Sequence, residues 1–265
     1  MNFVDSLLLG ILQGITEFLP ISSSGHLVLG EQLLGLNVGT LKSFDVALHF
    51  GTLFAIIVYF RKDVWEMLKA LGRMFLGRFS KSDPYAKLIL FIIIGTIPAV
   101  IAGVLGEEWI DSVFRHAKIV AVCMIAVGVI YLLGEAVYRR RGNLGMKWYK
   151  AIVTGLAQAV ALVPGVSRSG STIVAGLFQG VERSEAARFS FLLGIPAIFG
   201  AGVLTALKIP ANGGLGVELL PLITGFISSF IFGLLSVAFL MRFLKKNSLL
   251  VFAIYLVAVG VIVFV

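Results

Sequence analysis

The sequence is poor in charge: only 14% of its 265 residues are Asp, Glu, Lys or Arg. A soluble globular domain carries about 25% charged residues. Hydrophobic residues make up 58% of the chain and its mean hydropathy is +1.01, which excludes an ordinary soluble domain. Because apolar runs of membrane-spanning length recur along the whole chain, we expect a multi-pass membrane protein.

The sequence has a single cysteine and lacks the features of a cleavable leader. Cys123 is the only cysteine, so no disulfide can form within the chain, and its apolar surroundings favour a small core residue. The first residues, MNFVDSLLLGILQG, lack the basic segment and the small-residue cleavage site of a signal peptide. We therefore expect no removable leader.

Six apolar segments have the length of a transmembrane helix, at about 44–60, 88–106, 119–138, 187–207, 219–241 and 249–265. Two further apolar regions, about 3–36 and 150–180, are interrupted by Pro, Ser and Gly, and their arms are short. These two regions are predicted to be re-entrant helical hairpins, which enter the membrane and leave on the same side.

The positive charges fit this topology. Most of the 22 Lys and Arg residues fall in one set of connections, which the positive-inside rule assigns to the cytoplasm. The net charge of +8 therefore indicates orientation signals and contacts with anionic lipid, and no nucleic-acid partner is expected. Glu135, which precedes the run YRRR, is predicted to pair with one of those arginines.

An internal repeat relates the two broken regions. QGITEFLPISSSG (13–25) aligns with QAVALVPGVSRSG (158–170) at a constant offset, and AVGVI occurs at 126–130 and again at 258–262. The chain is thus predicted to contain two units, 1–142 and 143–265, each a hairpin followed by three spans. Since three is odd, the second unit is inverted. The predicted fold is an all-α polytopic membrane protein with an inverted-topology repeat, whose binding site lies near the bilayer midplane.

Both hairpin tips have the composition of an anion site. Each serine-rich tip directly precedes an apolar helical pattern, so both should direct a helix N-terminus and its free amides towards the centre of the protein. Arg168 adds a planar cation that matches phosphate geometry. The alternative is that the serines only make interhelical hydrogen bonds. The predicted diphosphate-binding residues are Ser22, Ser24, Gly25, Ser167, Ser169, Gly170 and Thr172, with the hydroxyl of Ser171 close by.

Glu17, Ser23 and His26 add reactive groups to this anion site. Gln13 and Glu17 are spaced i, i+4 and share one helical face. A divalent cation, Mg²⁺ first and Ca²⁺ or Mn²⁺ as alternatives, would reconcile Glu17 with a polyanion, with Gln13 as a second ligand. His26 is placed to orient or deprotonate Ser23, or to protonate the leaving group. Structural roles are the alternatives, with Glu17 as a neutral acid and His26 bonded to a nearby carbonyl.

These motifs resemble those of a known family. QGITEFLPISSSGH and PGVSRSGST are similar to the two signatures of the undecaprenyl-pyrophosphate phosphatase, or bacitracin-resistance, family, and the resemblance covers essentially the whole chain. It implies hydrolysis of undecaprenyl pyrophosphate to undecaprenyl phosphate and inorganic phosphate, which recycles the lipid carrier of peptidoglycan synthesis. It also implies a divalent cation and a location in the bacterial plasma (inner) membrane. Its catalytic residues would be Glu17, Ser23, His26 and Arg168, supported by Gln13, Ser22 and Ser167.

Several alternatives stay open at this stage. The nucleophile is Ser23, His26 or a water molecule. Asp45 and His49, spaced i, i+4, form a structural pair or a support for the site, or they contact the ligand directly. Because the first hairpin opens outward, the reaction is expected to face the extracytoplasmic side. A transporter or flippase of a phosphorylated polyprenyl lipid or small anion could use the same pocket. The partners are the polyprenyl pyrophosphate substrate and membrane lipids, and a homodimer is one assembly that the sequence allows.

Overall fold

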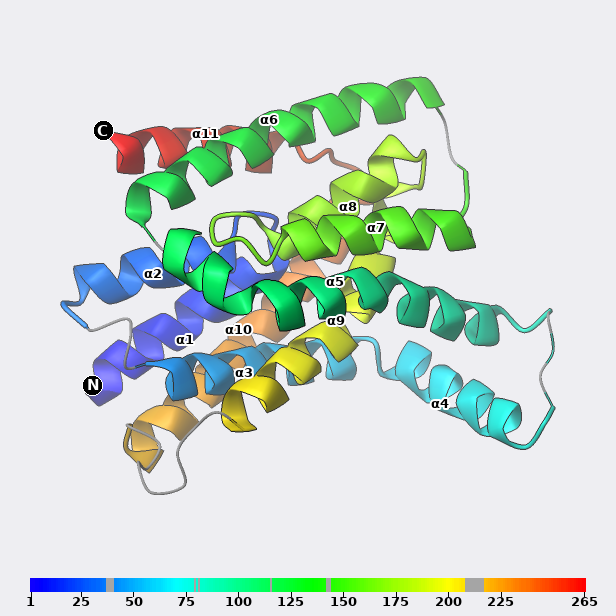
Figure 1. Ribbon diagram of the computed structural model, residues 1–265, viewed down its shortest axis with the longest axis horizontal. Coiled ribbons are helices and arrows are strands. Elements are labelled where there is room, and N and C mark those ends of the chain that lie inside the picture. Colours follow the sequence, from blue (N-terminus) through cyan, green and yellow to red (C-terminus); the bar gives the residue numbers. More distant parts are fainter. Residues whose placement is uncertain (37–40, 79, 81, 115, 142–143, 208–216) are drawn as a thin grey trace.

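The computed structural model is a bundle of α-helices, and no strand occurs among the residues that it describes (Figure 1). The described residues are 1–36, 41–78, 80, 82–114, 116–141, 144–207 and 217–265. The helices are α1 (Phe3–Phe18), α2 (Ser23–Leu33), α3 (Lys42–Tyr59), α4 (Arg61–Phe75), α5 (Pro84–Phe114), α6 (Ala117–Arg141), α7 (Trp148–Val160), α8 (Arg168–Phe178), α9 (Arg183–Leu207), α10 (Leu219–Phe243) and α11 (Leu250–Phe264). The all-helical fold class is confirmed.

Four helices, α5, α6, α9 and α10, are long and apolar enough to cross a membrane, and each covers one of the predicted spans. Helix α5 extends beyond its predicted span at both ends, to 31 residues. The other two predicted spans correspond to shorter helices. Helix α11 has 15 residues, and α3 is followed after one residue by α4, which is inclined to it by 82°. The connection between the predicted spans 44–60 and 88–106 therefore begins with a helix.

Each predicted hairpin is a pair of short helices joined by a break. Pro20 lies in the first break and Ser22 there adopts a left-handed conformation, with φ 71°. Gly165 lies in the second break at φ 92°, and a Cβ at this position would be 2.6 Å from the carbonyl oxygen of Val120. Glycine is thus required at 165, because both the backbone angle and the close approach exclude a side chain. In Figure 1 the α1–α2 hairpin enters the bundle from the left and the α7–α8 hairpin from the right.

The hairpin of each half packs against a span of the other half. Helix α1 packs on α10, the second span of the other half, and α7 packs on α5 in the same manner. Both contacts use small residues: a Cβ on Gly14 would lie 2.8 Å from the amide nitrogen of Gly233, and one on Gly155 only 2.3 Å from the carbonyl oxygen of Gly95. Backbones approach this closely where small residues meet in membrane helix pairs. These equivalent contacts support the predicted inverted repeat, which stays a prediction; its boundary at 142–143 lies outside the described residues.

The prediction for Glu135 is wrong. Its carboxylate accepts hydrogen bonds from the guanidinium of Arg183, at 2.5 Å from Nη2 and 3.0 Å from Nε, and from the backbone amide of Leu249 at 2.8 Å. Arg139 and Arg140 are exposed, whereas Glu135 is buried on the inner side of α6. The carboxylate is thus paired with a cation that reaches it from α9, so the contact ties α6, α9 and the start of α11 together.

Candidate functional site

Two helix N-termini begin at the serine-rich tips, as predicted. Ser22 caps α2 by accepting a hydrogen bond from the amide of Gly25 at 3.4 Å, and Ser167 caps α8 by accepting one from the amide of Gly170 at 3.2 Å. Ser23 and Arg168 are therefore the first residues of their helices. The first amides of a helix have no intrahelical acceptor and carry its positive dipole end. Both tips consequently offer donors to an anion.

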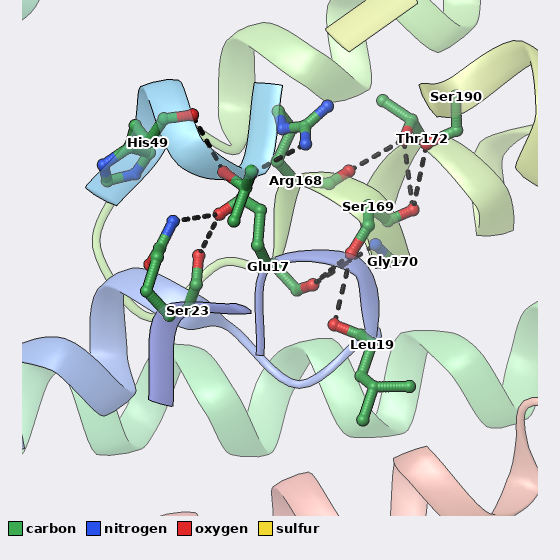
Figure 2. Close-up of polar contacts among 12 residues, drawn as sticks. Glu17, Leu19, Ser23, His49, Arg168, Ser169, Gly170, Thr172 and Ser190 are labelled. Carbon is green, nitrogen blue, oxygen red and sulfur yellow. Dashed lines mark hydrogen bonds and ion pairs between the residues drawn. The ribbon is translucent and has the colours of Figure 1, made fainter. Parts of the chain in front are cut away.

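The two tips are in contact with each other. The hydroxyl of Ser169 donates to the carbonyl oxygen of Leu19 at 3.3 Å and lies 3.3 Å from the hydroxyl of Ser167. Figure 2 shows Ser169 directed at the loop that carries Leu19, with Glu17 on the far side of that loop. Residues separated by 150 positions thereby come together inside the bundle.

Glu17 is the centre of the polar cluster (Figure 2). Its Oε1 accepts a hydrogen bond from Nη2 of Arg168 at 2.8 Å. Its Oε2 accepts one from the hydroxyl of Ser23 at 2.6 Å and one from the side-chain amide of Gln13 at 3.1 Å. The carboxylate is therefore bound to both hairpin tips at once. The Glu17 side chain is only 4% exposed and that of Arg168 16% exposed, so the ion pair is shielded from solvent.

The guanidinium of Arg168 is only partly used by this pair. Its Nη1 is buried and has no hydrogen-bond partner in the described part of the chain. It lies against Gly194 of α9, where an added Cβ would be 1.9 Å away. A buried unpaired guanidinium nitrogen is costly. This nitrogen is accordingly a buried donor without a partner among the described residues.

His26 is engaged away from Ser23. Its Nδ1 lies 2.8 Å from the carbonyl oxygen of Ser22 and its Nε2 lies 2.8 Å from the hydroxyl of Tyr255 on α11, with the two rings stacked at 5.7 Å. Because a carbonyl can only accept, Nδ1 carries the proton and Nε2 of the neutral ring is the acceptor. Ser23 instead donates to Glu17, so in this structure the carboxylate, and not the imidazole, polarises the serine hydroxyl.

Known proteins are similar to this chain over almost its whole length. The family model described as bacitracin resistance protein BacA matches residues 6–262. A protein of Rubrobacter xylanophilus named undecaprenyl-diphosphatase is 42% identical over 265 residues, covering 99% of this chain and 97% of its own. Proteins of the same name from Elusimicrobium minutum and Methanobrevibacter smithii are 41% and 40% identical, each over 100% of this chain and 98% and 97% of theirs. The chain belongs to the BacA family.

Thr172 and Ser24, both predicted to bind the diphosphate, do not contact the ion pair. Thr172 donates to the carbonyl of Arg168 at 2.8 Å and lies 2.5 Å from the hydroxyl of Ser190, so it joins α8 to α9. Ser24 is partly buried, and among the described residues no hydrogen bond joins its side chain to Glu17 or Arg168. Thr172 thus supports the second tip through α8.

Asp45 and His49 lie one helical turn apart on α3, and their roles at the site stay predictions. The His49 ring bonds the backbone carbonyl of Asp45 at 2.7 Å, one helical turn back. His49 also lies within electrostatic range of the Glu17 carboxylate and beside it in Figure 2. It therefore adds positive potential next to the cluster when it is protonated.

Three residues of the site were missed from the sequence. Gly194 provides the space for Arg168, Tyr255 binds His26, and Tyr131 lies where a Cβ on Gly170 would meet its hydroxyl at 1.4 Å. Each comes from a helix distant in sequence from the two motifs. The one available signal was the glycine within the apolar pattern of α9, because an isolated helical glycine often marks a close approach.

Proposed function

We propose that this chain hydrolyses undecaprenyl diphosphate to undecaprenyl phosphate and inorganic phosphate. The relatives covering nearly its whole length are named undecaprenyl-diphosphatase. The observation that carries the proposal is the Ser23–Glu17–Arg168 cluster at the junction of two helix N-termini. It joins a polarised hydroxyl, a carboxylate and a phosphate-binding cation. A transporter of phosphorylated lipid would need the cation and the helix dipoles but not the serine–carboxylate pair, so the transport alternative is not favoured.

Ser23 is the nucleophile in this proposal. Its hydroxyl donates to Glu17 at 2.6 Å, so the carboxylate can take the proton as the oxygen attacks the terminal phosphorus. The new bond is Ser23 Oγ–P, the bond that breaks joins that phosphorus to the bridging oxygen, and the bonding electrons leave with undecaprenyl phosphate. Water then hydrolyses the phosphoserine, giving inorganic phosphate and restoring the serine.

Arg168 and the helix N-termini hold the diphosphate. The guanidinium of Arg168 has one nitrogen without a partner among the described residues, and it stands at the first residue of α8, while Ser23 stands at the first residue of α2. Donors fixed in a water-poor site stabilise the charge on the phosphoryl oxygens without reorganising during the reaction. The apolar outer faces of the spans give the polyprenyl tail an environment like the bilayer.

A divalent cation fits this donor set only with help from the substrate. Oε1 of Gln13 is buried and has no hydrogen-bond partner among the described residues, and it is a hard oxygen donor beside the Glu17 carboxylate. No group of three or more His, Cys, Asp or Glu that could hold a metal occurs in that part of the chain. Mg²⁺ usually binds to one or two carboxylates together with substrate phosphates. Glu17 and Gln13 would thus hold the ion, which would neutralise phosphate charge.

His26 acts through Nε2 in this proposal, because Nδ1 is held by the carbonyl of Ser22. Nε2 would take up a proton when substrate enters and then donate a hydrogen bond to a phosphate oxygen, instead of accepting one from the Tyr255 hydroxyl. We further propose that the protein lies in the bacterial plasma membrane and that the α1–α2 hairpin opens to the extracytoplasmic side. Two observations support this: the basic connections lie at the opposite end of the bundle from the mouth of that hairpin, and the spans are apolar.

Phosphate release from undecaprenyl diphosphate by the purified protein tests the proposal. We expect release with Mg²⁺, none after chelation with EDTA, and none from Arg168→Ala. Intact-mass analysis of rapidly quenched reactions should detect a phosphorylated protein, with the modification at Ser23. Absence of phosphate release by the wild type with any of Mg²⁺, Ca²⁺ or Mn²⁺ would refute the activity, whereas release from Ser23→Ala at the wild-type rate would refute only the nucleophile.

A further inference from the structure

We propose that a second anion site lies at the end of α10, where it holds the head group of a doubly charged phospholipid. A cavity of about 360 Å³ lies between the α3–α4 junction and the end of α10. Four cations line it: Arg61, Lys62, Arg242 and Lys245. We call it the basic pocket.

The positive charge of the basic pocket is not neutralised by the protein. Asp63 is the one carboxylate in its lining, and its Oδ1 accepts a hydrogen bond from Nη2 of Arg188 on α9. Among the described residues no carboxylate forms an ion pair with any of the four lining cations; Arg61 donates only to the backbone carbonyl of Val58, at 3.3 Å. Four like charges around one cavity create a potential that favours an anion there.

The pocket lies at the level of lipid head groups. Helix α4 leaves the end of α3 at 82° and lies at the far right of the bundle in Figure 1, so it runs across the axis along which α3 enters the membrane. Its sequence is amphipathic, with exposed Trp65 and Leu68 and a polar face that includes Lys69. A helix of this type lies in the membrane interface, and tryptophan is enriched there. The basic pocket, at the first turn of α4, is at the same depth.

An apolar stripe leads to the pocket along α10. Ile227, Ile231, Leu235 and Phe239 are each about half exposed, are spaced by four residues and therefore follow one face of the helix. Phe239 is one turn before Arg242, which lines the pocket. An acyl chain lying on this stripe would bring its phosphate to the cations. This continuity favours a lipid over free phosphate, and four cations favour a head group with two negative charges.

Native mass spectrometry of protein released from phosphatidylcholine nanodiscs containing cardiolipin tests this inference. The wild type should retain cardiolipin in preference to phosphatidylglycerol present in equal amount. The double variant Arg242→Gln/Lys245→Gln should retain it at least about tenfold less, because each basic side chain near an anionic surface contributes separately to binding. The control Lys69→Gln/Lys147→Gln removes the same charge outside the pocket and should retain cardiolipin like the wild type.

Several results would overturn the proposal. Equal retention by both double variants would show that only the overall charge attracts lipid. Tighter binding of inorganic phosphate or of a polyprenyl monophosphate than of cardiolipin would assign the pocket to a different ligand. Phosphate release from undecaprenyl diphosphate in detergent, without cardiolipin, should be the same for wild type and both variants, so loss of the lipid site is distinguishable from loss of the hydrolytic site.

Discussion

Substituting Gly194 by alanine tests the placement of Arg168 without touching any charged group. The added methyl would be 1.9 Å from Nη1 and 2.9 Å from Cζ of Arg168. Ordinary carbon contacts are about 3.5–4.0 Å, so the guanidinium must move by more than about 1 Å. Its 2.8 Å hydrogen bond to Glu17 cannot stay in place during such a shift.

A misplacement of about 1 Å in a catalytic constellation can lower the rate on the order of 100-fold, equivalent to about 2.7 kcal/mol in the activation free energy. We therefore expect Gly194→Ala to lower kcat/KM for undecaprenyl diphosphate by that order. The thermal unfolding midpoint should change little, because alanine in a helix interior gains about 1 kcal/mol over glycine and offsets part of the weakened ion pair.

Gly200→Ala is the matched control. Gly200 lies on the same helix, and a Cβ added there would have no neighbouring atom within 4 Å, so the substitution should leave kcat/KM unchanged. The assay is phosphate release in detergent, measured together with the unfolding of each variant. Wild-type kcat/KM in Gly194→Ala would refute the reasoning, because it would show that the guanidinium is not required where the structure places it.

Three other substitutions test separate contacts. Ser23→Ala removes the proposed nucleophile and should lower kcat on the order of 10⁶-fold while substrate binding persists, as measured by phosphate release and direct binding. Tyr255→Phe removes a hydrogen bond that His26 gives up when substrate enters, so it should raise kcat/KM by about 2- to 10-fold, the range for about 0.5–1.5 kcal/mol. An unchanged ¹⁵N shift of His26 Nε2 would contradict this role. Glu135→Ala leaves Arg183 without its partner and should destabilise the fold by about 3–5 kcal/mol in a reversible unfolding assay, with wild-type turnover by the folded protein.

The features that follow from short-range rules were predictable from the sequence. Serine at a helix N-cap accepts from an amide three residues on, which is a local signal, and a helix begins at each serine-rich tip as expected. The repeat alignment then placed the two tips together, so the contact between Glu17 and Arg168 required only that the hairpins meet.

Contacts between distant helices were not predictable in the same way. Glu135 was assigned to a nearby arginine because i, i+4 pairs are common, but its burial favoured Arg183, which approaches from α9 and also bonds through Nε. His26 was predicted to act on Ser23 because it lies three residues after it, and a bond to a nearby carbonyl was the alternative. The carbonyl of Ser22, however, fixes the ring one turn back along α2 and directs Nε2 to Tyr255. In both cases the side chain follows the partner that satisfies its buried polar atoms, and sequence spacing does not encode that partner.

The differences between the two repeats explain why the two tips supply different chemical groups to the site. At the repeat offset Glu17 corresponds to Leu162, and Ser23 corresponds to Arg168. Two identical tips would present either two carboxylates or two guanidinium groups to each other, and like charges at contact distance are destabilising. One tip has the carboxylate of Glu17 and the hydroxyl of Ser23, and the other has the guanidinium of Arg168. The ion pair therefore forms between the two halves. The phosphate-binding group and the proposed nucleophile therefore reach the diphosphate from opposite hairpins, and neither half alone contains both.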